Sequence, residues 1–273
     1  MARRRGYLEE IKFEKRRRRQ RKLIFMSASF LALFLAGIYS LFYSGFFSID
    51  SLEVNEYKDI DKSSLDELIN NYLDEKVFFG LIPRRSNFIL VSKKYLEGKI
   101  EDTFVQLEKV NTDLAFFSKT ISVDLEKRET AGIWCFKSTE KCLYFDKQGF
   151  LFQEAGDSFK KENILTVVDE NKTSRYLRDS VSDREMLDKI IESDKVLKIL
   201  DFIGYLAFYI PENSFSDFYI KTSEGWDIYM DKTVNIEDQF FSLRELLNKK
   251  ISSEKRNSLK YMDLRIQGRV YYK

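Results

Sequence analysis

An uninterrupted apolar stretch near the N-terminus, residues 23–47, constrains this chain more than any other feature. Its sequence, LIFMSASFLALFLAGIYSLFYSGFF, contains no charged residue and no proline. As a helix it would be about 37 Å long, enough to cross a hydrocarbon core of about 30 Å. Backbone groups in lipid must be hydrogen-bonded within their own segment, so a lone apolar segment is expected to be helical. We therefore predict a transmembrane helix over residues 23–47.

The charges on the two sides of this segment differ in sign. Residues 1–22 contain 11 Lys and Arg against three Glu, a net charge of +8. The first residues after 47 are mainly acidic. Basic flanks of a membrane helix stay in the cytoplasm. A cleaved signal peptide would have a shorter apolar region and a small-residue cleavage site, and neither is evident. We expect a cytoplasmic tail (1–22), an uncleaved single-pass anchor in the inner or plasma membrane, and an extracytoplasmic region from residue 48.

Composition argues against several classes of function. The chain has no histidine, which excludes Ser-His-Asp triads, Cys-His pairs and histidine-ligated zinc. Beyond the tail, 35 basic residues face 41 acidic ones, which makes the exterior region a poor nucleic-acid binder. The basic tail suits membrane topology and attraction to anionic lipid. We expect contact with the lipid bilayer, and no metal, cofactor, nucleic acid or small-molecule substrate.

The two cysteines, Cys135 and Cys142, lie in two apolar runs on either side of a polar loop, a pattern typical of a β-hairpin. Outside the cytoplasm a disulfide across this hairpin is reasonable. It would close a short loop and so stabilise the fold by a few kcal/mol at most. Two free, half-buried thiols are the alternative, and the sequence leaves both open.

Residues 48–128 carry the pattern of a small α+β domain. We predict strands over 47–54, 105–110 and 120–127, and a loop over 77–85. One helix is predicted from the capping-box spacing of Ser64 and Glu67, and a second after Ser92. The order β-α-α-β-β gives a three-stranded sheet with two helices on one face.

Residues 129–273 have a β-rich pattern with flanking helices. Alternating and apolar runs predict strands over 133–136, 142–145, 150–152, 164–168, 215–222 and 226–230. Helical spacing of apolar residues predicts one helix from Met186 to Leu200 and another from Ile236 to Leu247. The chain is expected to end in a pair of strands, 261–266 and 269–273.

Five short motifs follow one another along these elements: Phe46-Phe47-Ser-Ile-Asp-Ser-Leu-Glu-Val54, Arg128-Glu129, Gly132-Ile133-Trp134, Asp146-Lys-Gln-Gly149 with Phe152, and Tyr261-Met-Asp263-Leu264-Arg265. Together with the order of elements, they resemble the FtsQ/DivIB family of bacterial cell division proteins. The resemblance covers essentially the whole chain and implies a POTRA domain over 48–128 and a β domain over 129–273. The family usually has a glutamate at the position of Lys127 and a proline at that of Thr130. The fold should accept Thr130, but a partner contact that used this glutamate is not expected here.

The resemblance implies a non-enzymatic bitopic scaffold at the division site. Such a protein would link cytoplasmic division proteins to FtsB- and FtsL-like membrane partners and to septal peptidoglycan synthesis. We expect the partner to add a strand to an exposed final strand running from Leu264 to Tyr272. The candidate partner-binding residues are Leu264, Arg265, Ile266, Arg269, Val270, Tyr271, Tyr272 and Arg128. Alternatively, this strand only completes the sheet of the β domain, and its charged residues prevent other strands from pairing with the edge.

Two other classes of function compete with the scaffold. One is a different membrane-anchored extracytoplasmic binding or sensor module. The other is an anchored cell-wall hydrolase, for which paired carboxylates would be needed. Candidate pairs are Glu9 with Glu10, Glu108 with Asp113, and Asp183 with Glu185. Chance pairs are expected among 44 acidic residues, so a solvated surface is favoured over a catalytic cleft.

Overall fold

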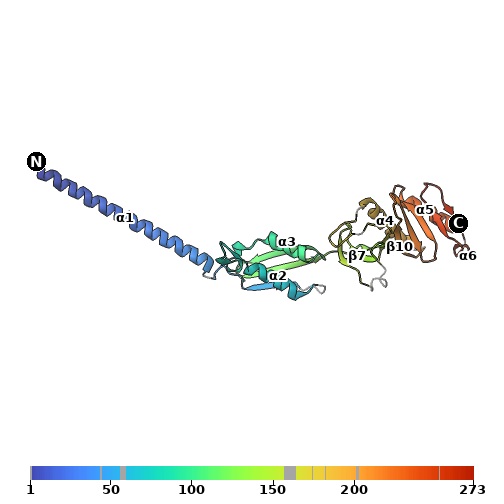
Figure 1. The fold of residues 1–273 in the computed structure, drawn as a ribbon, viewed down its shortest axis with the longest axis horizontal. Helices are drawn as coiled ribbons and strands as arrows, with labels where there is room; N and C mark the ends of the chain where they lie inside the picture. Colours follow the sequence, from blue (N-terminus) through green and yellow to red (C-terminus); the bar gives the residue numbers. More distant parts are fainter. Residues whose placement is uncertain are drawn as a thin grey trace. The chain divides into compact units, whose positions relative to one another are not determined.

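The structure, a computed structural model, is α+β, with a long apolar N-terminal helix and a large β-sheet (Figure 1). It divides into two compact units. Unit 1 comprises Met1–Phe104 and Lys109–Glu126, and unit 2 comprises Val105–Glu108 and Lys127–Lys273. The residues that the structure describes are 2–43, 45–55, 60–156, 164–173, 175–181, 183–200, 203–251 and 253–273.

Helix α1 (Ala2–Tyr43) contains most of the apolar stretch, residues 23–43. Its part from Lys15 to Tyr43 is long and apolar enough to cross a membrane, and none of that part is buried inside the protein. The helix ends at Tyr43, so the prediction that it continues to Phe47 is wrong. Gly45 lies in the turn that follows, at a φ of 68°. Glycine adopts this left-handed conformation at no steric cost, which explains why the helix stops before the aromatic pair.

Unit 1 contains a three-stranded sheet in the order β1-β5-β4. Strands β1 (Ser51–Val54) and β5 (Thr120–Lys127) run parallel, and β4 is Leu107–Ala115. Helices α2 (Lys62–Asp74) and α3 (Lys93–Thr103) turn their apolar residues inward. The buried side chains of this core are Leu65, Ile69, Tyr72, Leu73, Leu96, Ile100, Leu107, Val110, Ile121 and Val123.

Three local predictions for unit 1 are corrected. Helix α2 begins earlier than Ser64, because Asp61 is its N-cap and accepts hydrogen bonds from the amides of Ser63 and Ser64, both at 3.2 Å. The segment predicted as a loop over 77–85 contains a hairpin of β2 (Lys76–Val77) and β3 (Ile82–Pro83). Two 3₁₀ turns follow the hairpin, η1 (Arg84–Ser86) and η2 (Phe88–Leu90). Strand β4 starts two residues later than predicted and is longer.

Unit 2 is built on a nine-stranded mixed sheet in the order β14-β13-β12-β11-β10-β9-β6-β7-β8. Its strands are β6 (Gly132–Phe136), β7 (Lys141–Phe145), β8 (Leu151–Glu154), β9 (Thr166–Asp169), β10 (Tyr205–Ile210), β11 (Asp217–Thr222), β12 (Asp227–Asp231), β13 (Tyr261–Asp263) and β14 (Tyr271–Tyr272). Its helices are α4 (Arg184–Leu200), α5 (Ile236–Lys249) and α6 (Ser253–Arg256). The sequence pattern does not predict β10, because its run YLAFYI lacks the alternation of a half-exposed strand.

The core of unit 2 lies between the sheet and helices α4 and α5. One row of directly paired residues crosses the sheet and is buried throughout: Leu143, Trp134, Val167, Phe208, Ile220, Ile228 and Met262. The helices contribute Leu187, Ile190, Phe240 and Leu243 to the same core. Full burial of each large apolar side chain stabilises a fold by about 1.5–3 kcal/mol, so this layer dominates the stability of the unit.

Candidate partner-binding site

The C-terminal residues form a hairpin at one end of the large sheet, as the predicted pair of strands, 261–266 and 269–273, implies, and not one exposed strand from Leu264 to Tyr272. Leu264 is buried, and residues 266–268 form a turn in which Gly268 has a φ of 72°. The amide of Arg269 closes this turn on the carbonyl of Ile266 at 3.0 Å. One continuous strand over 264–272 is therefore wrong, because the turn reverses the chain. The predicted pair of final strands is confirmed, although both are shorter than expected. The edge strand itself, β14, contains only Tyr271 and Tyr272.

Strand β14 pairs with β13 on one side, and no other strand of the described residues pairs with it. Tyr271 lies opposite Asp263, and the amide of Lys273 donates to the carbonyl of Tyr261 at 3.3 Å. Successive amides of a strand point to opposite sides. The N–H of Tyr272 is therefore directed away from β13, at the free edge of the sheet. The side chains of Tyr271 and Tyr272 are both about half exposed.

Arg265 is held by two carboxylates. Its guanidinium donates to Asp263 at 2.9 and 2.6 Å and to Asp217 of β11 at 2.8 Å. It also lies 5.5 Å from the ring centroid of Tyr229. The hydrogen bond from Arg265 holds the pKa of the Asp263 carboxyl below its usual value, with burial opposing the shift. Arg265 thus connects β11 to the residues after β13, and its donors are largely engaged within the protein.

A row of tyrosines crosses the face of the sheet opposite the buried row. Tyr209, Tyr219 and Tyr229 are paired across β10, β11 and β12, and their ring centroids are 4.8 and 5.6 Å apart. Tyr261 of β13 continues the contact to Tyr229 at 5.8 Å. Burial raises the pKa of Tyr219, with the charge of Glu170 adding to the shift. Burial also raises the pKa of Tyr229, so the middle of this aromatic row is partly shielded from water.

The sequence pattern does not predict this tyrosine row. One signal is present, because Tyr209, Tyr219 and Tyr229 recur at a spacing of ten residues. A repeat of about this length is typical of consecutive strands joined by tight turns. The spacing alone does not reveal that the three strands are neighbours on one face, which depends on the pairing of the sheet.

The cysteine hairpin lies on the same face as the tyrosines. Cys135 and Cys142 are directly paired between β6 and β7, with Cα atoms 4.0 Å apart, and form a disulfide. Cys135 is also opposite Val168 of β9, which is opposite Tyr209. The disulfide and the tyrosines therefore belong to one continuous row across the sheet.

Arg128 is not part of the C-terminal site. Its guanidinium binds Asp146 at 2.6 Å and the carbonyl of Leu107 at 3.1 Å, and it covers the ring of Phe150 at 4.5 Å. Asp146 and Phe150 flank the turn between β7 and β8, and β8 lies at the opposite end of the sheet from β14. The structure therefore does not bring Arg128 together with the other candidate residues.

Three of the carboxylates proposed for a hydrolase bind lysines within the protein. Asp183 and Glu185 both bind Lys232, at 2.7 and 3.4 Å. Asp113 binds Lys93 at 3.0 Å. The side chains of Glu9 and Glu10 lie outside the described part of the structure. Among the described residues, no group of three or more potential metal ligands is found.

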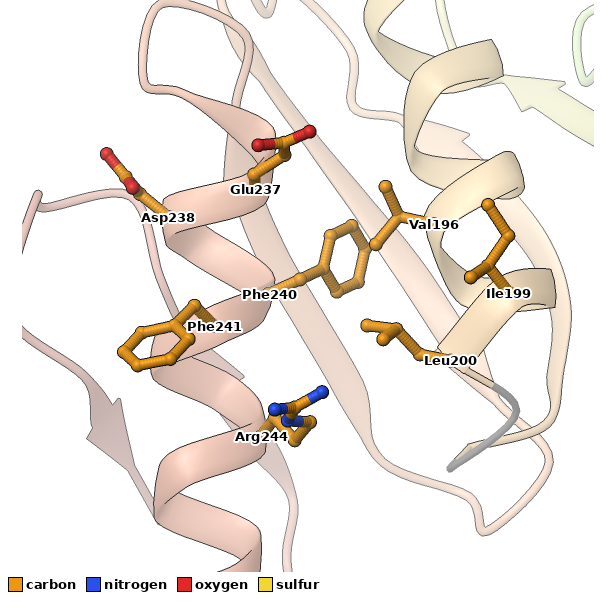
Figure 2. Close-up of a pocket in the computed structure, with 8 residues that line it drawn as sticks. All are labelled: Val196, Ile199, Leu200, Glu237, Asp238, Phe240, Phe241 and Arg244. Atoms are coloured by element: carbon orange, nitrogen blue, oxygen red, sulfur yellow. The ribbon is translucent and has the colours of Figure 1, made fainter.

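A second surface of interest is a groove of about 440 Å³ between α4 and α5 (Figure 2). Phe240 points into it, with Val196 and Leu200 across from it on α4. Glu237 and Asp238 lie toward one end and Arg244 toward the other. The remaining lining residues, Ile199 and Phe241, are 80% and 61% exposed. This groove is apolar with charged ends, so it is suited to another polypeptide rather than to covalent chemistry.

In comparisons with known proteins, no protein-family model and no curated protein matches this sequence.

Proposed function

We propose that this protein is a membrane-anchored, non-enzymatic scaffold of the bacterial division machinery, of the FtsQ/DivIB type. Helix α1 would be the single anchor, with the basic tail in the cytoplasm and both domains outside. In this proposal residues 48–128 are a POTRA domain and residues 129–273 a β domain. The partners would be FtsB- and FtsL-like membrane proteins, recruited at the division site.

The free edge of β14 is the observation that carries this proposal. It lies at the end of a nine-stranded sheet, and the amide of Tyr272 is directed away from its neighbour β13. An extended segment from a partner can pair with such an edge, with affinity from backbone hydrogen bonds and specificity from side chains. Arg269 and Lys273 flank the edge, which favours an acidic partner segment.

The neighbouring face would add specificity to this contact. Tyr271 and Asp263 belong to the same row as the paired tyrosines, so a partner that reaches β14 can continue across Tyr229 and Tyr219. Tyrosines provide large rigid contact area with a polar tip and are enriched where proteins meet. In this arrangement Arg265 is a positioning residue that holds the hairpin against β11, rather than a direct ligand of the partner.

A proline substitution tests the edge. Tyr272→Pro removes an N–H that the sheet does not use, and proline is tolerated at such edge positions. Tyr272→Ala removes the side chain but keeps the N–H. We expect Tyr272→Pro to weaken partner binding at least about tenfold, about 1.4 kcal/mol, and Tyr272→Ala to weaken it less. The full chain of each variant is purified from its native membrane, and the amount of FtsB- and FtsL-like protein that copurifies with it measures the effect.

Two results would refute the proposal at different levels. If Tyr272→Pro stays folded and retains its partners as the unsubstituted protein does, strand addition at β14 is wrong. The groove between α4 and α5 would then be the next surface to test, by Phe241→Asp. If a fluorescent fusion of the full chain stays evenly distributed along the membrane in dividing cells, the division role itself is wrong.

A further inference from the structure

An aromatic cluster surrounds the C-terminal end of helix α1 within unit 1. Phe46 and Phe47, which follow the helix, contact Phe116 with both ring centroids at 5.6 Å. Phe88 lies 5.0 Å from Phe116 and 5.8 Å from Phe47. Phe117, next to Phe116, extends from this cluster and is 97% exposed. Three segments distant in sequence therefore meet where the apolar stretch ends.

Polar contacts fix the same segments to the end of the helix. The last carbonyls of a helix have no partner within it. The buried side chain of Asn87 donates to the carbonyl of Leu41 at 2.9 Å. Lys119 donates to the carbonyl of Gly45 at 2.8 Å, and the amide of Phe88 donates to the carbonyl of Phe47 at 3.1 Å. The loops that carry these residues are therefore held beside the helix end.

The tip of the β2–β3 hairpin, residues 78–81, also contacts the end of the helix. The ring of Phe78 contacts that of Phe42 at 6.1 Å, and Phe42 lies within the apolar stretch. Phe79 is fully exposed and Leu81 is 70% exposed. Phe78 and Phe79 have φ values of 50° and 58°, which bulky residues rarely adopt. Such strain is found mainly at functional sites, and the exposed Phe79 ring gains nothing from protein contacts that would offset it.

The segment that carries these apolar groups has no carboxylate of its own. From Val77 to Ser92 the sequence contains no Asp or Glu, and its Arg84 and Arg85 bind Glu75 and Asp74 at 3.2 and 2.8 Å. Ile89, in the same segment, is 70% exposed. Exposed apolar and aromatic groups in a segment without carboxylates are suited to the interface of a bilayer, where aromatic rings are favoured.

We infer, on the basis of the proposed membrane anchor, that the hairpin tip and Phe117 insert into the lipid interface beside the end of α1. Phe79 and Leu81 would enter from the hairpin, and Phe117 from the turn between β4 and β5. The occupant of this apolar surface is the bilayer itself, because Phe78 already contacts a helix residue that lies in the predicted span. Together with α1, these contacts would hold unit 1 against the membrane.

Site-specific fluorescence tests the insertion in the full chain, reconstituted in nanodiscs that contain anionic lipid. An environment-sensitive dye is attached to Phe79→Cys or Phe117→Cys, and mass spectrometry verifies one label per chain. Leu33→Cys, in the middle of the apolar stretch, controls for the anchor. Glu126→Cys is the matched exposed control, six residues beyond Thr120 on β5 and so roughly 20 Å along that strand. Lipids that carry a quencher either near the headgroup or deep in the acyl chain report depth.

We expect blue-shifted emission at positions 79 and 117, with stronger loss of intensity from the headgroup quencher than from the deep one. Position 33 should respond most to the deep quencher, and position 126 to neither. If position 33 is quenched while 79 and 117 behave like 126, the inference is wrong and the anchor stands. If 79 and 117 are blue-shifted without quenching by lipid, a protein surface covers them and the inference is again wrong. If position 33 is not quenched, the proposed anchor fails.

Discussion

Removing the Arg128 side chain should destabilise unit 2, because it leaves a buried carboxylate without its cation. The Arg128 side chain is 18% exposed and that of its partner Asp146 only 4%. Asp146 also accepts hydrogen bonds from the amides of Gln148 and Phe150, at 2.8 and 2.9 Å, so it organises the turn between β7 and β8. In Arg128→Ala its carboxylate stays buried with only these two amides as partners.

The magnitude follows from the burial of the pair. Breaking a buried ion pair by removing one partner typically costs about 3–5 kcal/mol. Arg128 is partly accessible to water, so we expect the lower end, about 3 kcal/mol. For a domain of about 150 residues, this corresponds to a fall in Tm of about 6–12 °C. In the double variant with Asp146→Ala the loss should be smaller than the sum, because no uncompensated charge remains.

Tryptophan fluorescence provides a selective assay. The chain has two tryptophans, Trp134 and Trp226, and both are buried in unit 2. Thermal melting of the full chain in detergent, followed by their emission, therefore reports on this unit. Lys147→Ala is the matched control in the same turn, since Lys147 binds Glu129 at 2.6 Å but both side chains are about 70% exposed. If Arg128→Ala has the same Tm as Lys147→Ala, burial of the ion pair does not determine its contribution to stability.

Three further predictions concern unit 2. Gly132→Ala should destabilise it by about 1–3 kcal/mol in the same melting assay, because a Cβ there would lie 2.6 Å from a backbone carbonyl oxygen; an unchanged Tm would contradict this. Arg265→Gln should lower the stability to urea more at pH 7 than at pH 2. Asp263 has a lowered pKa in the folded protein, so its carboxylate stabilises the fold above its unfolded pKa, near 3.8, and this stabilisation is lost as the pH falls through the folded pKa. Equal losses at both pH values would count against this prediction. Cys135 and Cys142 should resist alkylation without reductant in protein from its native membrane, and intact-mass detection of two alkylated thiols would show that they are free.

Local patterns in the sequence determine the helices and the tight hairpins. The stretch after residue 22 favours a long apolar helix, because it contains no charge and no proline. Helices α4 and α5 follow from apolar spacing, and the hairpin of β6 and β7 follows from two short apolar runs around a polar loop. In each case the interacting residues are close in sequence, so the pattern and the structure report the same contacts.

Tertiary structure alone decides which strands are neighbours. β10 lies between β9 and β11, far from β9 in sequence, and β13 pairs parallel to β12 across helix α5. These pairings, rather than any local motif, align the tyrosines in one row and leave β14 at the edge. Local residues predict the turn at Gly268 between two final strands, but only the tertiary structure buries Leu264 against the core and limits the edge strand to Tyr271 and Tyr272.

The residues around α1 show the same difference between what local patterns predict and what tertiary structure decides. The sequence alone predicts an apolar helix, but the loop residues that meet its end come from three separate segments. Phe79 reads as an ordinary loop residue in the sequence, and its exposure beside the helix depends on where the β2–β3 hairpin lies. Side-chain surroundings of this kind depend on contacts between residues that are distant in the chain, so periodicity and local propensity do not encode them.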